Sequence, residues 1–348
     1  MNNLKSKLLA EYDTSFEAVM ISWPHEGTDW APMLAEARQC YLELARAILQ
    51  AGCTLVVISP DVSATRTELR SLPSRNVVVV EVPTNDTWIR DYGMLTLGLD
   101  GSPIAGDFQF NGWGLKFAAN LDNRVTSRLF EMLPNIAKAD LRATVLEGGS
   151  VETDGKGTVL TTSECLLSAN RNNFHSKAEA EAMLSRCLGA ERVLWLDNGA
   201  LQGDDTDSHV DTLARFASDD TIVYVKCYRD DDTHYLGLHM MEEELREFRT
   251  PSGQPYNLVG LPLPDPCYDP DDGHRLPATY ANFLITPRAV IMPTYGQERN
   301  DRMARMMLES VFAPEREVIT VDCRALIRQH GSLHCATMQI PRAFVPKA

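Results

Sequence analysis

The sequence predicts a mixed α/β fold built from five similar units. Strand, strand, helix and strand follow one another in that order five times along the 348 residues. The final strand, Leu333–Ile340, lacks a partner in its own round, and the first round opens on a single strand, Ala18–Ser22, that also needs one. Repeats that cannot bury their apolar faces alone close most economically into a ring. A conventional two-domain α/β protein is the alternative that this pattern leaves open.

The first two rounds contain one long helix and several apolar strands. The expected helix Pro32–Gln50 begins behind a proline and ends before Gly52, which is the usual asymmetry of helix ends. Val77–Val82 is apolar apart from Glu81 and is expected to open the second round as a largely buried strand. The other elements expected here are strands at Thr54–Ile58, Gly93–Leu97, Ile104–Phe110 and Leu141–Leu146 and a helix at Leu121–Leu133.

The third round contains the clearest turn signal. Its hairpin, Ser150–Thr153 with Thr158–Thr162, encloses an Asp-Gly turn. Its helix, Ser176–Leu188, opens with Ser176 and has Glu179 three residues on, which is the capping-box pattern. The remaining elements expected in rounds three to five are strands at Val193–Leu196, His209–Phe216, Thr221–Cys227, Tyr256–Gly260, Tyr280–Thr286, Ala289–Pro293 and Glu317–Asp322 and helices at Tyr235–Phe248 and Asn300–Phe312.

Composition restricts the partners and the compartment. The formal net charge of −15 disfavours nucleic acid and anionic membranes and would attract a cationic ligand, although an acidic surface kept for solubility explains it equally well. No apolar run is long enough to span a bilayer, and the N-terminus lacks a signal-peptide pattern, so we expect a cytoplasmic protein. The eight cysteines form no CxxC pair, which predicts reduced thiols, most of them in the core.

Candidate catalytic residues occur near the start of successive hairpins. His209 and Asp211 are two residues apart, so in an extended strand their side chains would share one face. Asp91, Glu147 and Cys335 occupy a similar position in other rounds. Because equivalent positions of successive units in a ring meet at its axis, we expect these five side chains to form one site.

The residue types at this site point to chemistry on a guanidinium group. A cysteine attacks as the thiolate and needs a base or an electropositive neighbour, for which His209 is the better partner. Three carboxylates at one axis would repel one another unless a cation lies among them. The histidines show no HExxH spacing, and the aspartate-rich turns lack a calcium-loop register, so no metal is predicted. A planar guanidinium is the cation that carboxylates grip bidentately.

These roles give a reaction. Carboxylates would hold the cation while Cys335 attacks its central carbon, and His209 would protonate the departing ammonia and then activate water. Four neighbouring residues receive other expectations. His334 would face away from Cys335 on a strand and serve structure, Arg90 would form a structural ion pair, Trp113 would pack in the core, and Asp86 would cap a turn or lie at the pocket rim.

Several motifs together resemble the agmatine deiminase and bacterial peptidylarginine deiminase family of guanidino-group modifying enzymes. They span nearly the whole chain and are specific only in combination. The matching stretches are Asn85–Gly93, Phe110–Gly114, Glu147–Ser150, Cys165–Leu167, Asn170–Asn172, Asp205–Asp211 and the pair His334-Cys335.

The resemblance implies a five-bladed α/β propeller, hydrolysis of a guanidine to a ureido group with release of ammonia, and no cofactor. It implies that Cys335 is the nucleophile and His209 the acid and base, with Asp91 and Asp211 as guanidinium ligands and Glu147 as their acidic partner. Trp88 matches a tryptophan that lines the substrate slot. Two departures, Ser208 and the stretch Gln329–Leu333 before His334, border the pocket and bear on the substrate rather than the chemistry.

We therefore predict that residues 1–348 form a single catalytic propeller domain, similar to agmatine deiminases. The expected reaction converts agmatine to N-carbamoylputrescine and ammonia, a step toward putrescine. A peptidylarginine deiminase, or a deiminase of another small guanidine, is the alternative within this chemistry. A propeller that only binds guanidines and an amidino-transferring enzyme lie outside it, and intact Cys335 and His209 argue against the pure binder. Sequence leaves the oligomeric state, including a homo-oligomer, open.

Overall fold

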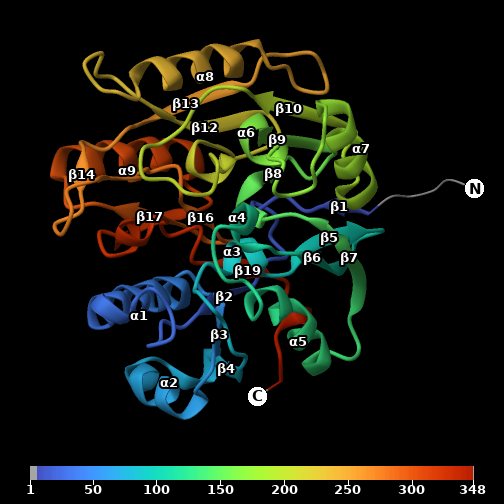
Figure 1. Ribbon diagram of the computed structural model, residues 1–348, viewed down its shortest axis with the longest axis vertical. Helices are drawn as coiled ribbons and strands as arrows, with labels where there is room; N and C mark the ends of the chain where they lie inside the picture. The colour runs from blue at the N-terminus through green and yellow to red at the C-terminus, as the bar shows by residue number, and fades with distance from the viewer. Residues whose placement is uncertain (1–5, 348) are drawn as a thin grey trace, which may run out of the picture.

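The structure, a computed structural model, describes residues 6–347 and has a mixed α/β fold (Figure 1). Its described part contains five larger sheets and one small one. The larger sheets consist of β19 (Met338–Ile340), β2 (Ala18–Ser22), β3 (Thr54–Ser59) and β4 (Val77–Glu81); β1 (Lys7–Leu8), β5 (Leu95–Leu99), β6 (Ser102–Gln109) and β7 (Ala137–Val145); β8 (Val151–Thr153), β9 (Thr158–Thr162) and β10 (Arg192–Leu196); β11 (Ala214–Phe216), β12 (Thr221–Lys226) and β13 (Asn257–Pro262); and β16 (Leu284–Ile285), β17 (Ala289–Thr294) and β18 (Glu317–Asp322). The small sheet pairs β14 (Cys267–Tyr268) with β15 (Arg275–Leu276).

The five larger sheets share one plan. In each, two strands pair antiparallel and the second pairs parallel with a third, as in β8, β9 and β10. The predicted pairing of the last strand with the first is confirmed, since β19 runs antiparallel to β2 with Met338 opposite Met20. The expected place of β4 is wrong: it does not open the second unit but lies parallel to β3 in the first sheet. β3, which is buried from Leu55 to Ser59, is a central strand paired on both edges.

The helices connect the parallel strands and lie outside the sheets. Figure 1 shows α1, α7, α8 and α9 toward the periphery of the view and α3, α4 and β19 near its middle. Ser176 caps α7 as predicted, because its hydroxyl accepts from the backbone N–H of Glu179. The Glu179 carboxylate accepts from the N–H of His175 rather than that of Ser176, so the capping box is only half formed, and Gly189 ends the helix in the left-handed conformation. The helices are α1 (Leu34–Gln50), α2 (Val62–Glu68), α3 (Ile89–Tyr92), α4 (Gly112–Leu115), α5 (Val125–Met132), α6 (Ser163–Leu166), α7 (Lys177–Leu188), α8 (Tyr235–Glu247) and α9 (Glu298–Phe312).

Contacts link each sheet to the next one along the chain and the fifth back to the first. The first and second meet where α3 packs on β2, and α3 also contacts η5, a 3-10 turn at Gly148–Ser150. η5 in turn contacts η6, a 3-10 turn at Val210–Thr212, while α9 packs on β13 and α1 on β18. A ring of five units would make these contacts. They are consistent with the five-bladed propeller, which stays a prediction. The turns α3, η5 and η6 carry most of the predicted site.

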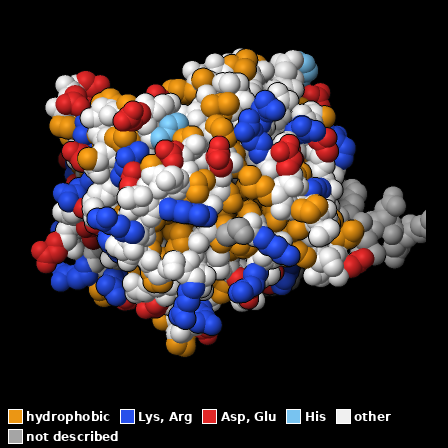
Figure 2. All heavy atoms as spheres, turned by 90° about the horizontal axis from the view of Figure 1, so that it is seen from below, with side chains coloured by type: hydrophobic (Ala, Val, Ile, Leu, Met, Phe, Trp, Pro, Cys, Tyr) orange, Lys and Arg blue, Asp and Glu red, His pale blue; other side chains and the backbone are white. Residues whose placement is uncertain are grey.

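The surface mixes charge and apolar groups. On the face in Figure 2, acidic and basic side chains are interspersed around exposed hydrophobic ones, so the net charge of −15 does not produce a single-signed surface there. Among the described residues, no helix has the length and apolarity that crossing a membrane requires.

Candidate active site

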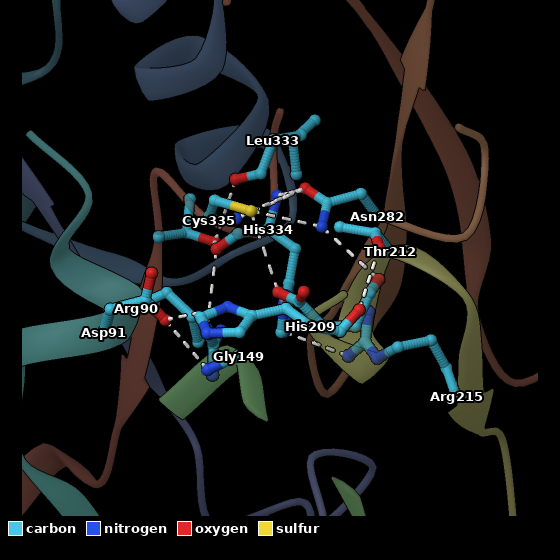
Figure 3. A network of polar contacts seen from close by, with 12 residues as sticks. Arg90, Asp91, Gly149, His209, Thr212, Arg215, Asn282, Leu333, His334 and Cys335 are labelled. Carbon is cyan, nitrogen blue, oxygen red and sulfur yellow. Dashed lines mark hydrogen bonds and ion pairs between the residues drawn. The ribbon is translucent and has the colours of Figure 1, made fainter. Parts of the chain in front are cut away.

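Three of the predicted side chains converge on Gly149 in η5. A Cβ at this glycine would lie 2.7 Å from Nδ1 of His209 and 3.0 Å from Oδ2 of Asp211 and Oδ1 of Asp91. Any side chain at position 149 would therefore fill the space between them. Figure 3 shows Asp91, Gly149 and His209 side by side with Cys335 across from them. Residues far apart in sequence thus form one buried cluster.

Short turns, rather than strands, position these groups. Asp91 lies in α3 just before β5, Glu147 just before η5, and Cys335 in a turn just before β19. The expectation that His209 and Asp211 share a face of an extended strand is wrong. His209 precedes η6 and Asp211 lies within it, so a tight turn, not the period of two, directs both side chains inward. The strand proper, β11, begins at Ala214.

Asp91 is held by two donors. Its Oδ1 accepts from the backbone N–H of Gly149 and its Oδ2 from the indole N–H of Trp113, each at 2.9 Å. Burial raises the pKa of Asp91 despite the neighbouring His209, which lowers it. The expected core packing of Trp113 is confirmed, and its indole N–H also fixes the orientation of a site carboxylate.

Cys335 is buried beside Asn282 and Asp211. Nδ2 of Asn282 lies 3.3 Å from the sulfur, and Oδ2 of Asp211 lies 3.7 Å from it. Burial, followed by the negative charges of Asp211 and Asp91, raises the pKa of the thiol well above its usual range. The thiol is therefore neutral at physiological pH unless positive charge enters the site.

His209 has a carboxylate on each side of its ring. Nε2 lies 3.4 Å from Oε2 of Glu147, and Nδ1 lies 3.6 Å from Oδ1 of Asp91. Burial would lower the pKa of His209, but Asp91, Cys165 and Glu147 raise it well above 6.5. Nδ1 of His209 and Oδ1 of Asp211 are buried and have no hydrogen-bond partner among the described residues. Unsatisfied buried polar atoms are costly, so two at one place indicate a ligand.

Glu147 lies behind His209 and does not line the pocket. Its carboxylate accepts from Nε of Arg171 at 2.7 and 3.0 Å. Burial would raise its pKa, but His209 and Arg171 lower it overall. Glu147 thus contacts the His209 ring, and its contact with a substrate stays a prediction. Its ligand atom also lies close to those of Cys165 and His209, but Arg171 already balances its charge where a metal would otherwise be needed.

A narrow pocket leads to Cys335. Trp88 lines it as predicted, and a Cβ at Gly331 would lie 2.5 Å from the Trp88 ring, so the chain passes there only as glycine. Asp86 lines the pocket, which was one of its two expected positions; its side chain accepts from the N–H of the adjacent Thr87 and does not cap α3. The lining residues are Asp29, Asp86, Trp88, Asp91, Trp113, Phe117, Asp205, Thr206, Gln329, His330, Gly331 and Cys335.

Two further expectations are wrong. His334 does not point away from the site on a strand; it lies in the turn before β19, and its Nδ1 is 2.7 Å from Oδ2 of Asp211. Arg90 pairs with no carboxylate among the described residues. Its guanidinium donates instead to the side-chain oxygen of Gln339 at 2.6 Å and to the carbonyl of His334.

Sequence reasoning missed Asn282. Its side chain contacts the Cys335 sulfur and accepts from the backbone N–H of His334 at 2.9 Å. The signal was present, because Asn282 stands just before the hairpin of β16 and β17 as Asp91, Glu147, Asp211 and Cys335 stand before theirs. The fifth unit should have been expected to supply a residue at the same position.

Comparison with known families decides the assignment. The family model described as Porphyromonas-type peptidyl-arginine deiminase matches residues 7–341. The chain belongs to this family. An agmatine deiminase from Pseudomonas aeruginosa (strain LESB58) is 31% identical over 357 residues, covering 96% of this chain and 95% of the relative. The chain is therefore a member of a family of deiminases, which are hydrolases.

Solved structures of the family agree. A C. jejuni agmatine deiminase variant with substrate bound is similar with a TM-score of 0.88 and 38% identity over 97% of both chains. A proposed arginine deiminase from Porphyromonas gingivalis has a TM-score of 0.91 and 48% identity over 97% of this chain and 99% of its own. A dimethylarginine dimethylaminohydrolase, at 14% identity and a TM-score of 0.51, shares the fold alone. The predicted α/β class, matching this pentein group, is confirmed.

Proposed function

We propose that this chain is an agmatine deiminase, which hydrolyses agmatine to N-carbamoylputrescine and ammonia. The observation that carries the proposal is the cluster at Gly149, where Oδ2 of Asp211, Oδ1 of Asp91 and the unpartnered Nδ1 of His209 meet, with the Cys335 sulfur 3.7 Å from that Asp211 oxygen. Two carboxylates and a thiol around one buried space suit a planar cation with an electrophilic carbon. The deiminases that resemble this chain support the same chemistry.

In this proposal the substrate itself activates the nucleophile. The Cys335 thiol is neutral in the empty site because burial and two aspartates oppose its ionisation. A guanidinium held by Asp91 and Asp211 would bring positive charge next to the sulfur and lower the pKa of the thiol. The thiol releases its proton to solvent, and the thiolate then attacks the guanidinium carbon to form a tetrahedral adduct. The carboxylates, already oriented, stabilise the positive charge on the nitrogens.

His209 moves the protons. Because its pKa is raised, it begins as the imidazolium and gives a proton to the departing amino group, which leaves as ammonia. The neutral imidazole then takes a proton from water, which attacks the thiouronium carbon and displaces Cys335. Glu147, 3.4 Å from Nε2, stabilises the imidazolium state. The carboxylates find their counter-charge in the substrate, so the proposal needs no metal or cofactor.

The pocket favours a substrate with a second positive charge. Asp29, Asp86 and Asp205 line the approach to Cys335, and no lysine or arginine lines it among the described residues. Agmatine carries an ammonium group at its far end, whereas free arginine carries a carboxylate that these aspartates would repel. A peptidylarginine deiminase is the second candidate, favoured by the family model. The proposal includes one catalytic propeller domain over residues 1–348; a cytoplasmic location remains an expectation from the sequence.

An ammonia-release assay tests the proposal. Purified protein is given agmatine, free arginine and an arginyl peptide separately, each at about 1 mM, near the upper end of common KM values. We expect turnover of agmatine far above the other two, and none with Cys335→Ala. Preference for the peptide would replace agmatine by peptidylarginine. Absence of ammonia from every guanidine would rule out the deiminase.

A further inference from the structure

The two oxygens of the Asp211 carboxylate have different surroundings. Oδ2 accepts from Nδ1 of His334 at 2.7 Å and lies 3.7 Å from the Cys335 sulfur. Oδ1 is buried and has no partner among the described residues. Asn282 donates only to the backbone carbonyl of Asp211 and so does not fix its side chain. Among the described residues, the His334 ring nitrogen and the Cys335 thiol are the side-chain donors to Asp211, and both reach Oδ2. His334, at the shorter distance, therefore fixes the orientation of this carboxylate.

His334 is itself held from the opposite side. Its Nε2 lies 2.7 Å from Oε2 of Glu11, a residue of the segment before the first sheet. The Glu11 carboxylate is fixed by the backbone N–H of Ile285 at 2.6 Å and by an ion pair with Arg215. The His334 residue is 1% exposed. Each ring nitrogen has a carboxylate oxygen within hydrogen-bonding distance, and Nε2 also lies 3.0 Å from Nη2 of Arg215.

The contact between His334 and Asp211 matters because an aspartate carboxylate rotates easily about χ2. A guanidinium bound in the plane of a carboxylate requires that torsion to be fixed. Misplacement of a reacting group by about 1 Å can cost on the order of 10²-fold in rate.

We propose that His334 is a positioning residue for Asp211: its Nδ1–H holds Oδ2, the oxygen beside Cys335, and so fixes the plane in which the carboxylate meets the guanidinium, while Glu11 holds His334 in turn. This inference rests on the proposed function, since it requires that Asp211 binds a guanidinium. It assigns a role to His334 and Glu11, two buried residues that take no part in bond making or breaking. His334 would act only through Asp211 and would not touch the substrate.

A matched pair of variants separates positioning from packing. In His334→Asn the amide nitrogen falls near the place of Nδ1 and can still donate to Asp211. In His334→Gln it falls near Nε2 and reaches Glu11 instead. We expect His334→Asn to keep kcat/KM for agmatine within about 10-fold of wild type and His334→Gln to lose about 10²-fold, with KM raised as well as kcat lowered. Equal losses in both variants would overturn the proposal.

A second readout does not depend on turnover. 2-Chloroacetamidine carries a planar cationic amidinium group that the site carboxylates can bind, and it alkylates cysteine with loss of chloride. Iodoacetamide alkylates cysteine with loss of iodide but is neutral, so the carboxylates do not attract it. We expect His334→Gln to slow alkylation of Cys335 by the cation about 10²-fold and by iodoacetamide less than about threefold. A purely structural role would change both reagents alike. If wild-type Cys335 shows no preference for the cationic reagent and no guanidine is turned over, the proposed function fails instead.

Glu11→Gln supplies a test far from the pocket. It keeps a polar group beside His334 but removes the charge, so we expect a smaller selective loss, about three- to tenfold, with the cationic reagent only. A urea unfolding curve of each variant shows whether it is folded at the assay temperature. Should His334→Gln fail to fold, Glu11→Gln decides: an unchanged rate, or equal losses with both reagents, contradicts the proposal.

Discussion

Two buried charge clusters meet at His334 and differ in how completely their groups are paired. On one side, Asp211 and His209 each keep a polar atom without a partner. On the other, Arg215 is fully buried and pairs with Glu11 and Glu152, and it also donates to the carbonyl of Phe283 at 2.6 Å. Both clusters are buried and charged, so burial does not distinguish a site from a scaffold. The two clusters differ in the unpartnered atoms of Asp211 and His209, which lie beside the Cys335 thiol.

The cluster around Arg215 has its charge balanced internally. Burial would lower the pKa of Arg215, but Glu11 and Glu152 raise it above its usual range. The pKa of Glu11 is lowered by Arg215 and His334 against the effect of burial, while burial and the charge of Glu11 raise that of Glu152. One guanidinium therefore lies between two carboxylates. The catalytic cluster has carboxylates in similar proximity and lacks the guanidinium, which the proposed substrate would supply.

The largest effect should come from removing the nucleophile. Cys335→Ala should lower ammonia release from agmatine by at least about 10³-fold, because no thiolate remains to form the covalent intermediate. Cys187→Ala, which changes a buried cysteine of α7 that contacts Thr144, is the matched control and should keep most of the activity. Comparable rates of ammonia release by wild type and Cys335→Ala would show that Cys335 and the cluster around it do not catalyse the reaction.

Arg215→Met should break the paired cluster. It leaves two buried carboxylates without their cation, and we expect the free energy of unfolding to fall by about 3–5 kcal/mol. Urea denaturation followed by circular dichroism measures the loss. Arg142→Met, which removes an exposed arginine paired with Asp140, is the control and should change stability by less than about 1 kcal/mol. An Arg215→Met protein as stable as wild type would contradict a scaffold role for this cluster.

Asp211→Asn should separate the two clusters. The amide oxygen can still accept from His334, so the fold should be retained with a stability loss below about 2 kcal/mol. The charge facing the guanidinium is lost, and kcat/KM for agmatine should fall by about 10²-fold, with both capture and turnover affected. Steady-state kinetics and a urea curve of the same preparation are the measurements. A variant with normal kinetics would remove Asp211 from the site.

The smallest expected effect lies at the pocket mouth. Burial raises the pKa of Asp86 to about 8 and that of Asp205 to about 6. Both carboxyls are therefore neutral below these values and become negative as pH rises through them. The KM for dicationic agmatine should fall about two- to fivefold between pH 6 and 9. Methylguanidine, which lacks the second charge, should show less change, and Asp86→Asn should flatten the agmatine profile. A flat wild-type profile would argue against binding of the ammonium there.

The sequence predicted which residues form the site better than it predicted the backbone turns that position them. The motifs identified Cys335, His209, Asp91 and Asp211, and the structure brings them together. The expected strand geometry of His209 and Asp211 was wrong, because the period-two argument cannot recognise a 3-10 turn followed by a short strand. The residue types were therefore predicted correctly, although the local backbone geometry was not.

The residues behind the site were beyond sequence reasoning for a different reason. Glu11 belongs to a segment whose apolar residues follow neither the helix nor the strand period. Its sequence neighbours therefore do not predict that it is buried against Arg215. His334 was assigned to a strand that begins only at Met338. Asn282 could have been found by requiring the fifth unit to match the others. Long-range pairing of charged groups is decided by tertiary structure, and a single sequence gives no measure of it.

The pairing of β19 with β2 has a consequence for synthesis of the chain. The sulfur of Cys335 lies just before the strand that completes the first sheet, so the reactive group and the closing strand emerge from the ribosome almost together. A product that stops before this point has the carboxylates and His209 but neither the nucleophile nor the strand beside β2. Truncated translation products should therefore be inactive and should expose an unpaired edge of β2, which can pair with other chains.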